Sequence, residues 1–341
     1  MANPNDRGFN TIQNSRVARR RKTETLQIYT VLGVAAMAFL IVIILAVMAV
    51  GGVVGNADNQ GNNPSNEKIE WGTFTVITTD TLKGELVLVN QAHVYTFPAT
   101  EDHLGKLNDK RLTHDPRVYM QSGLSDRMDA TALDALDKML VDFHTATGKD
   151  NVTLRYAYRS AQEQQDLVNS GKATIEAGYS DHHTGLGIEL GFYRDGLTYD
   201  LAADPIYNWL FENCHKYGFV IRYPADKVEQ TGIEDYAEYF RYVGVAHATY
   251  MKQNNLCLEE YITALKEYDE KKPLVIEAAD GKIYAIYYVA VDGSATVKHP
   301  TNFTYTVSGT NEGGVVVTVD RSGKTADTSA DTSAQSGTVQ P

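Results

Sequence analysis

A histidine and a carboxylate lie seven residues apart in the stretch 180–190, which reads SDHHTGLGIEL. His182 offers an imidazole nitrogen and Glu189 offers carboxylate oxygens, and both groups are ordinary zinc ligands. Gly185 and Gly187 lie between them and allow a tight turn with a close approach of the backbone. The stretch therefore has the residue types of half a metal site, although a polar turn that leads into a strand would contain the same residues.

The neighbouring residues predict the elements that would position these side chains. Residues 187–192 are typical of a short buried strand, which would hold Glu189 rigidly. A helix is predicted over 129–147, because Asp129 can cap it, apolar side chains recur along one face, and a glycine follows its end. Ser160 and Glu163 form a capping box for a second helix that extends to about residue 169.

The remaining elements alternate irregularly. Further strands are predicted at 74–78, 85–90, 152–157, 219–223 and 240–243. Further helices are predicted at 204–217, 244–254 and 258–271, the first with a capping Asp204, Pro205 at its first position and Gly218 after its end. Because strands and helices mix without regular alternation, the predicted class is α+β.

Three more motifs accompany the first stretch: YRSAQEQ at 158–164, WLFENCHKYGF at 209–219, and FRYVG at 240–244. In this order and spacing the chain resembles the VanY-type D-alanyl-D-alanine carboxypeptidases, over roughly residues 84–271. The resemblance implies the fold shared by hedgehog signalling domains and D-Ala-D-Ala zinc peptidases, a small antiparallel sheet flanked by helices. It also implies an activity, the removal of the last D-alanine from a peptidoglycan stem peptide.

The resemblance places the zinc ligands and the general base on four positions. The first ligand falls on His182, and the second, an aspartate in the family, falls on Glu189. The last histidine ligand falls on Tyr239, and the glutamate that acts as general base falls on Tyr236. A phenol has a pKa near 10 and must lose its proton before it can bind a metal, so two of the four positions are degenerate and zinc occupancy is doubtful.

Two glutamates close to these tyrosines are candidates for the missing base. Glu238 is the possible stand-in, and Glu234 is the other, since both flank Tyr236 in the sequence. A different interpretation is that Tyr236 and Tyr239 fill the vacated metal cavity and hydrogen-bond the remaining ligands.

The positions that hold the substrate are better kept. The resemblance places the arginine that grips the terminal carboxylate of the peptide on Arg159, and the planar guanidinium suits that task. Gln164 and Ser180 also match positions that contact the peptide in the family. A structural salt bridge is the alternative for Arg159.

The amino-terminal part of the chain predicts a membrane anchor. Residues 1–25 are polar and basic, and residues 26–54 are almost wholly apolar and free of charge, longer than the roughly 20 residues that cross a bilayer as a helix. Basic residues before the span favour a cytoplasmic amino terminus and an extracytoplasmic main domain. The predicted localisation is a bacterial cell membrane, crossed once; a cleaved signal peptide is the alternative, with a shorter apolar region.

Composition sets the rest of the organisation. The net charge is −12, and residues 1–26 carry +4, so the remainder carries −16, which argues against a nucleic-acid partner. The expected order is a basic tail (1–25), the membrane helix (26–54), a linker (55–67), a VanY-like domain (68–272), a β appendage with strands at 283–291, 303–308 and 315–319 (273–320), and a disordered tail (321–341). The two cysteines, Cys214 and Cys257, are expected to be buried free thiols.

These observations leave three hypotheses. The first is a membrane-anchored VanY-like protein that binds peptidoglycan stem peptides, or a partner in wall synthesis, with lost or weakened zinc catalysis. The second is an active D-alanyl-D-alanine carboxypeptidase with an altered metal site. The third is a structural or scaffolding ectodomain of the cell-wall machinery, whose β appendage makes the functional contacts.

Overall fold

The computed structural model describes residues 68–122, 127–234 and 236–324. The predicted basic tail, membrane helix and linker lie outside these residues, as does most of the predicted disordered tail. Residues 321–324, the first four of that tail, instead form the end of a strand. In the described part of the chain, no helix combines the length and the apolar character needed to cross a bilayer.

The sheet that carries the first stretch confirms the α+β class. Its strands run in the order β3, β5, β6, β9, β8, with β7 paired to β6, and all pairs are antiparallel except β3 with β5. The bounds are β3 Met120–Gln121, β5 Val152–Leu154, β6 Gly187–Arg194, β7 Leu197–Tyr199, β8 Phe219–Tyr223 and β9 Tyr236–Tyr242. A separate short pair joins β2 (Leu104–Lys106) to β4 (Arg127–Asp129).

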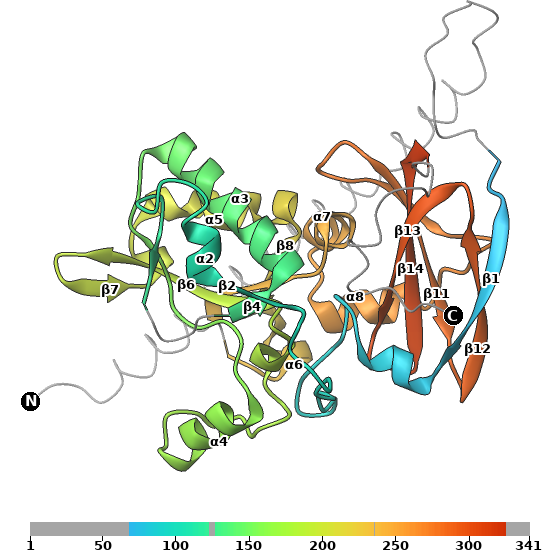
Figure 1. Cartoon of the computed structure of the whole chain (residues 1–341), viewed down its shortest axis with the longest axis horizontal. Coiled ribbons are helices and arrows are strands. Elements are labelled where there is room, and N and C mark those ends of the chain that lie inside the picture. Colours follow the sequence, from blue (N-terminus) through green and yellow to red (C-terminus); the bar gives the residue numbers. More distant parts are fainter. Residues whose placement is uncertain (1–67, 123–126, 235, 325–341) are drawn as a thin grey trace, which may run out of the picture. The chain divides into compact units, whose positions relative to one another are not determined.

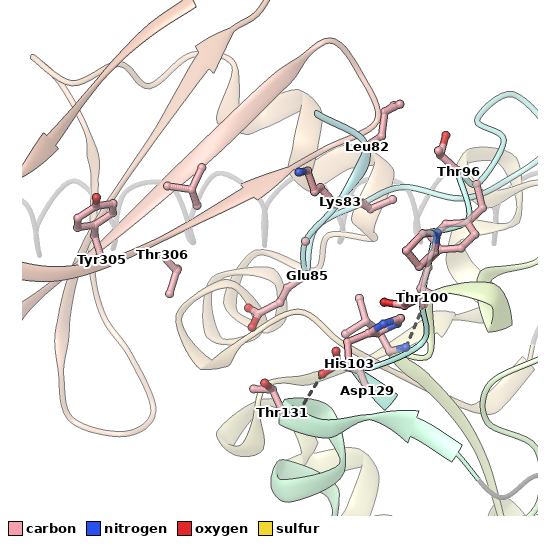
Figure 2. Close-up of a pocket in the computed structure, with 17 residues that line it drawn as sticks. Leu82, Lys83, Glu85, Thr96, Thr100, His103, Asp129, Thr131, Tyr305 and Thr306 are labelled. Carbon is pink, nitrogen blue, oxygen red and sulfur yellow. Dashed lines mark hydrogen bonds between the residues drawn. The ribbon is translucent and has the colours of Figure 1, made fainter. Parts of the chain in front are cut away.

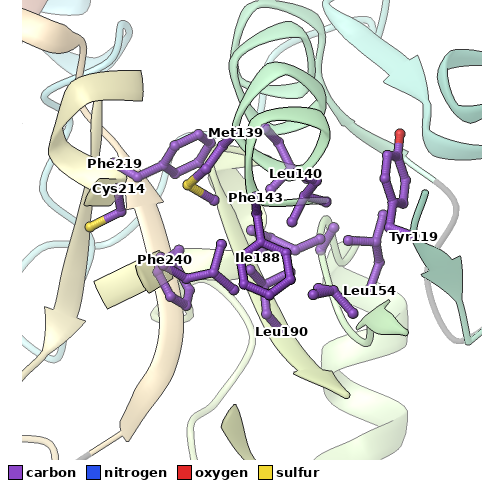
Figure 3. Close-up of a cluster of buried hydrophobic side chains, with 14 of the residues drawn as sticks. Tyr119, Met139, Leu140, Phe143, Leu154, Ile188, Leu190, Cys214, Phe219 and Phe240 are labelled. Carbon is purple, nitrogen blue, oxygen red and sulfur yellow. The ribbon is translucent and has the colours of Figure 1, made fainter. Parts of the chain in front are cut away.

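Most of the helices in the described chain pack on this sheet or connect its strands, whereas the last two, α7 and α8, also pack against the β appendage. Their bounds are α2 Leu107–Arg111, α3 Ala130–Thr147, α4 Ala161–Asn169, α5 Asn208–Asn213, α6 Val228–Thr231, α7 Val245–Asn254 and α8 Leu258–Leu265. The two predicted caps are confirmed: Asp129 accepts from the backbone of α3, and Ser160 with Glu163 forms a capping box on α4. Figure 3 shows Met139, Leu140 and Phe143 of α3 packed over Ile188 and Leu190 of β6.

The pairing of β6 with β9 places the two altered positions near the retained ligand positions. Glu189 of β6 lies directly opposite Tyr239 of β9. An irregularity between β8 and β9 brings Tyr236 opposite Tyr223. Because side chains of directly opposed residues lie on the same face of a sheet, the register itself gathers these residues.

The β appendage has more strands than the sequence predicts. One sheet has the order β10, β11, β14, β13, with bounds Leu274–Glu277, Ile283–Ala290, Gly314–Lys324 and Phe303–Gly309. A second pair joins β12 (Ser294–Pro300) to β1 (Trp71–Ile77), and Figure 1 shows the blue β1 beside the orange β12. Apolar side chains of both sheets form a shared core. The predicted strand at 74–78 is therefore a strand, but it pairs with the appendage.

The predicted strand at 85–90 is wrong. Its residues form a buried segment without a strand partner, and its amide groups bond to the appendage instead: Leu86 N donates to Ser308 Oγ at 2.8 Å and Leu88 N donates to the Thr310 carbonyl at 3.1 Å. The apolar run from Leu86 to Val89 is buried, but hydrogen bonds to the appendage take the place of a strand ladder. The prediction of buried free thiols at Cys214 and Cys257 is confirmed.

Candidate functional site

His182 lies on a short 3₁₀ helix, Asp181–Thr184, that precedes β6. Its Nδ1 lies 2.7 Å from the carbonyl of Ala157. Since a carbonyl only accepts, Nδ1 carries the proton and Nε2 carries the lone pair. Burial, with the charge of Arg159, holds the pKa of His182 well below its usual value, so the ring is neutral. A neutral imidazole with its Nδ1–H fixed is the form that binds metals through Nε2.

The neighbouring His183 has no such free nitrogen. Its Nδ1 donates to the carbonyl of Arg159 at 2.7 Å, and its Nε2 accepts from the amide of Gly178 at 3.0 Å. Both ring atoms are therefore used to fix the backbone around the site.

Glu189 is engaged by two side chains. Its Oε1 forms a 3.0 Å ion pair with Nη1 of Arg155, which also contacts Asp200 at 2.9 Å. The hydroxyl of Tyr236 hydrogen-bonds the same carboxylate, and burial together with this bond raises the pKa of Tyr236. The residue at the family's general-base position is therefore a hydroxyl that donates to the carboxylate at the second ligand position.

Tyr239 points toward Asp181 rather than toward Glu189, and its hydroxyl lies 3.2 Å from Oδ2 of Asp181. Its ring packs edge-on against His182, with centroids 4.7 Å apart. Burial, with the charge of Asp181 next, holds the pKa of Tyr239 well above its usual value, so the phenol stays protonated. A Cβ at Gly187 would lie 2.0 Å from the Tyr239 oxygen, so this orientation requires glycine there.

Asp181 belongs to a buried ionic network behind the ring of Tyr239. Its carboxylate pairs with Nη1 of Arg241 and lies 3.7 Å from Nε of Arg222. Arg222 in turn makes two hydrogen bonds, of 2.9 and 2.7 Å, to Glu259. Two arginines and two carboxylates balance in charge, which is the condition under which buried ions are tolerated.

The residues assigned to peptide binding, Arg159 and Gln164, contact each other and leave one donor unused. Nη1 of Arg159 donates to Oε1 of Gln164 at 3.2 Å, and the guanidinium lies 4.8 Å from the ring centroid of Tyr156. Its Nε is buried without a hydrogen-bond partner among the described residues. Gln164 uses its other end to donate to the carbonyl of Ile175 at 2.6 Å. Gln164 therefore orients Arg159, while the arginine keeps an unused donor.

The remaining predicted residues lie around this centre. Ser180 is buried and forms the N-cap of the helix that bears His182. Glu238 is buried and interacts with the backbone of Ala202, and burial raises its pKa. Glu234 is exposed before β9. In the described part of the chain, no hydrogen bond joins either glutamate to His182 or Tyr239, and their roles stay predictions.

The residues present do not fit a zinc ion. Within residues 68–122, 127–234 and 236–324, no group of three or more His, Cys, Asp and Glu side chains converges so that it could hold a metal. His182 supplies one nitrogen, Glu189 is neutralised by Arg155, and Tyr239 is a protonated phenol bound to Asp181. A zinc site needs at least three such protein ligands.

Sequence reasoning did not assign Arg155 and Asp181, the two residues that hold the substituted site together. The signal for Arg155 is the register of two predicted strands, since its amide bonds to the carbonyl of Glu189 at 2.9 Å. That register depends on knowing that the two strands pair. Asp181 stands next to His182 in the sequence, but its partners Arg222 and Arg241 come from strands that lie far along the chain.

Comparisons with known proteins identify the family of this chain. The family model of VanY, D-alanyl-D-alanine carboxypeptidase, matches residues 125–245. A D-alanyl-D-alanine carboxypeptidase from Enterococcus faecium is 31% identical over 72% of this chain and 78% of its own length. Another, from Enterococcus faecalis (strain ATCC 700802 / V583), is 28% identical over 55% of this chain and 69% of its own length.

A solved structure extends the likeness to the fold. The vancomycin-resistance D,D-dipeptidase VanXYg, solved with a D-Ala-D-Ala phosphinate analogue, is 26% identical and superimposes with a TM-score of 0.63. The match covers 74% of this chain and 99% of that chain. The chain belongs to the VanY family of D-alanyl-D-alanine carboxypeptidases and has the fold of the VanX/VanY peptidases.

Proposed function

We propose that this chain is a membrane-anchored, extracytoplasmic member of the family that binds peptidoglycan stem peptides and has lost or weakened zinc-dependent hydrolysis. The anchor rests on the apolar span 26–54 and the basic residues before it. The ligand class rests on the family and on a relative that was solved with a D-Ala-D-Ala analogue.

One observation carries the loss of hydrolysis: the side chains at three of the family's metal and base positions, Glu189, Tyr236 and Tyr239, are bound to other protein side chains. Glu189 is shared by Arg155 and Tyr236, and Tyr239 donates to Asp181. A cation beside Glu189 repels a metal ion, and it also removes the charge that would attract one. A neutral phenol has little basicity, so Tyr236 cannot take a proton from water near neutral pH.

Arg159 supports the retention of peptide binding. Its guanidinium is oriented by Gln164 and stacked on Tyr156, and its Nε is buried without a partner among the described residues. A buried donor without a partner is costly. A peptide carboxylate would satisfy this donor with a charge-assisted hydrogen bond.

Metal analysis paired with peptide digestion tests the loss of hydrolysis. Protein purified without added metal is expected to contain far less than one equivalent of zinc and to release no D-alanine from stem peptides. Stoichiometric zinc together with D-alanine release would overturn this part of the proposal.

Titration with a fluorescent acyl-D-Ala-D-Ala peptide tests the binding. Arg159→Ala is expected to weaken binding at least tenfold, because a charge-assisted hydrogen bond contributes about 1.5–3 kcal/mol. Arg117→Ala is the matched control, since Arg117 is an exposed arginine that forms an ion pair with Asp115, two residues before it. Equal affinity in the parent and in both variants would contradict the assignment of Arg159.

An active carboxypeptidase with an altered metal site is a second candidate. The observation in its favour is His182, whose Nδ1–H is fixed by Ala157 and whose Nε2 keeps its lone pair. Activity that is abolished by a chelator and by His182→Ala would support this candidate over the first.

A further inference from the structure

A cavity of about 590 Å³ lies between α3, the segment that follows β1, and strand β13 of the appendage, and its lining also includes Thr184, the last residue of the 3₁₀ helix that bears His182. Figure 2 shows Glu85 pointing into it, with Tyr305 and Thr306 on one side and His103, Asp129 and Thr131 on the other. Its volume falls within the range of about 300–1,000 Å³ that is usual for ligand sites, which often lie where two substructures meet.

The wall that carries Glu85 is fixed on both sides. The carbonyl of Lys83 accepts from the amide of Gly309 at 2.7 Å, and the amide of Leu86 donates to Ser308 Oγ at 2.8 Å. From the other side, Nη2 of Arg241 donates to the carbonyl of Glu85 at 3.0 Å. The backbone that carries Glu85 is therefore fixed before any ligand arrives, which lowers the entropic cost of binding.

Many polar groups of this cavity have no partner. Among the described residues, no hydrogen bond or ion pair engages the carboxylate of Glu85. The same holds for a set of hydroxyls that line the cavity, those of Thr96, Thr100, Thr131, Tyr305 and Thr306. Around His182, by contrast, the side chains of Glu189, Tyr236 and Tyr239 all have side-chain partners.

The mixture of groups selects the chemistry of a ligand. Two carboxylates, Glu85 and Asp129, repel an anion, and the density of hydroxyls disfavours an apolar ligand. An ammonium group would use acceptors only and would leave the hydroxyl donors idle. A ligand that carries several hydroxyls of its own both donates and accepts. Tyr305 also lines the cavity, and its ring packs against His299 and the core of the appendage.

We propose that this cavity binds a neutral pyranose sugar, as a ring of a glycan chain, with Glu85 accepting from ring hydroxyls and Thr306 contributing from the appendage. The cavity is partly open, so a chain can continue beyond it. Burial, with Asp129, raises the pKa of Glu85 to about 7, so near neutral pH the carboxyl group can donate as well as accept. This cavity is a different site from the one at Arg159, and the proposal for either site stands without the other.

Calorimetric titration of the full chain with two tetrasaccharides tests the proposal. The tetramer of β-1,4-linked N-acetylglucosamine probes a wall-type glycan, and maltotetraose probes a storage-type one. Binding of either supports a sugar site, and the tighter of the two assigns its source. Binding of neither, or tighter binding of 1,5-diaminopentane, would overturn the proposal.

Variants locate the binding. Glu85→Ala and Thr306→Val are each expected to weaken sugar binding at least fivefold, because each removes a polar group that faces the cavity. Thr304→Val is the matched control, since Thr304 is exposed on the same strand and does not line the cavity. Thermal melting checks that each variant folds, and Thr306→Val retains the shape of the residue it replaces. Sugar binding that is unchanged by both substitutions would refute the location.

Arg159→Ala separates this inference from the function proposed above. It is expected to weaken peptide binding and to leave sugar binding within twofold of the parent. Loss of both by this one substitution would mean that the two ligands share a site, and the separate cavity would be refuted.

Discussion

The site around His182 and the cavity around Glu85 differ in how their polar groups are satisfied. Around His182, Glu189 bonds to Arg155 and Tyr236, and Tyr239 bonds to Asp181. Around Glu85, the carboxylate and the hydroxyls have no partners in the described part of the chain. A site built for a ligand leaves polar groups unpaired until the ligand arrives. The comparison therefore favours ligand binding at the cavity and at Arg159. It favours loss of hydrolysis at the site around His182.

The largest effect is expected from restoring the family's residues. The variant Tyr236→Glu with Tyr239→His replaces both phenols with a carboxylate and an imidazole, and it is expected to take up about one equivalent of zinc. Release of D-alanine, which is expected to be absent in the parent, should become measurable, because a general base contributes about 100-fold or more to the rate. Tyr239→His alone should gain zinc with little turnover. Failure of the double variant to bind zinc would contradict the assignment of the lost zinc binding to the two phenols.

A large loss of stability is expected from Arg241→Met. This change leaves Asp181 buried beside a single, more distant cation, Arg222, and breaking a buried ion pair costs about 3–5 kcal/mol. The free energy of unfolding in urea measures it. Lys138→Met is the control, because Lys138 pairs with Asp142 on the surface and such pairs contribute about 0.3–0.5 kcal/mol. Equal losses in both variants would contradict the buried network.

A smaller effect, dependent on pH, is expected from Glu85→Gln. Burial, with Asp129, raises the pKa of Glu85 from 4.5 to about 7, against an opposing effect of Arg241. The native state then holds a proton that the unfolded state has released, so stability falls as pH rises from about 4.5 to 7. Since one pKa unit corresponds to about 1.4 kcal/mol, the penalty above pH 7 is at most about 3 kcal/mol.

Glutamine removes this titration. The variant is expected to match the parent near pH 4.5 and to melt at a higher temperature at pH 8. Melting temperatures across this range provide the measurement, and parallel curves for the parent and the variant would show that Glu85 ionises freely.

The smallest expected effect is a difference in unfolding free energy between two tyrosine-to-phenylalanine variants. Tyr239→Phe removes a hydroxyl that donates to Asp181 and is expected to cost about 1 kcal/mol of unfolding free energy. Tyr305→Phe removes a cavity hydroxyl without a partner among the described residues and is expected to cost close to nothing. Similar costs for the two would mean that the hydroxyl at the substituted metal position is no better satisfied than the one in the cavity.

Local signals predicted much of the fold but only part of the site. The caps at Asp129 and Ser160 follow from neighbouring residues and are confirmed. The sequence pattern predicts a strand at 85–90, which is wrong because the partners of this segment lie more than two hundred residues away. The partners of Arg155 and Asp181 also come from other strands, 34 and 60 residues away, so the sequence does not assign these two residues. The motifs at 158–164 and 240–244, by contrast, place Arg159 and Tyr239 directly. The spatial neighbours of a residue depend on which distant strands pair, and a single sequence does not show that pairing.

The pairing of β1 with β12 has a consequence for any truncation. Trp71 lies opposite Pro300, so β1, at the start of the described chain, pairs with β12, which is synthesised near its end. During synthesis β1 must wait for almost the entire remainder of the chain, which makes this pairing a slow, non-local step. Removing residues 273–341 would strip β1 of its neighbour and expose Phe74 and Val76 along a bare edge, a template for self-association. A soluble fragment without the appendage must therefore begin after β1 as well as end before β10.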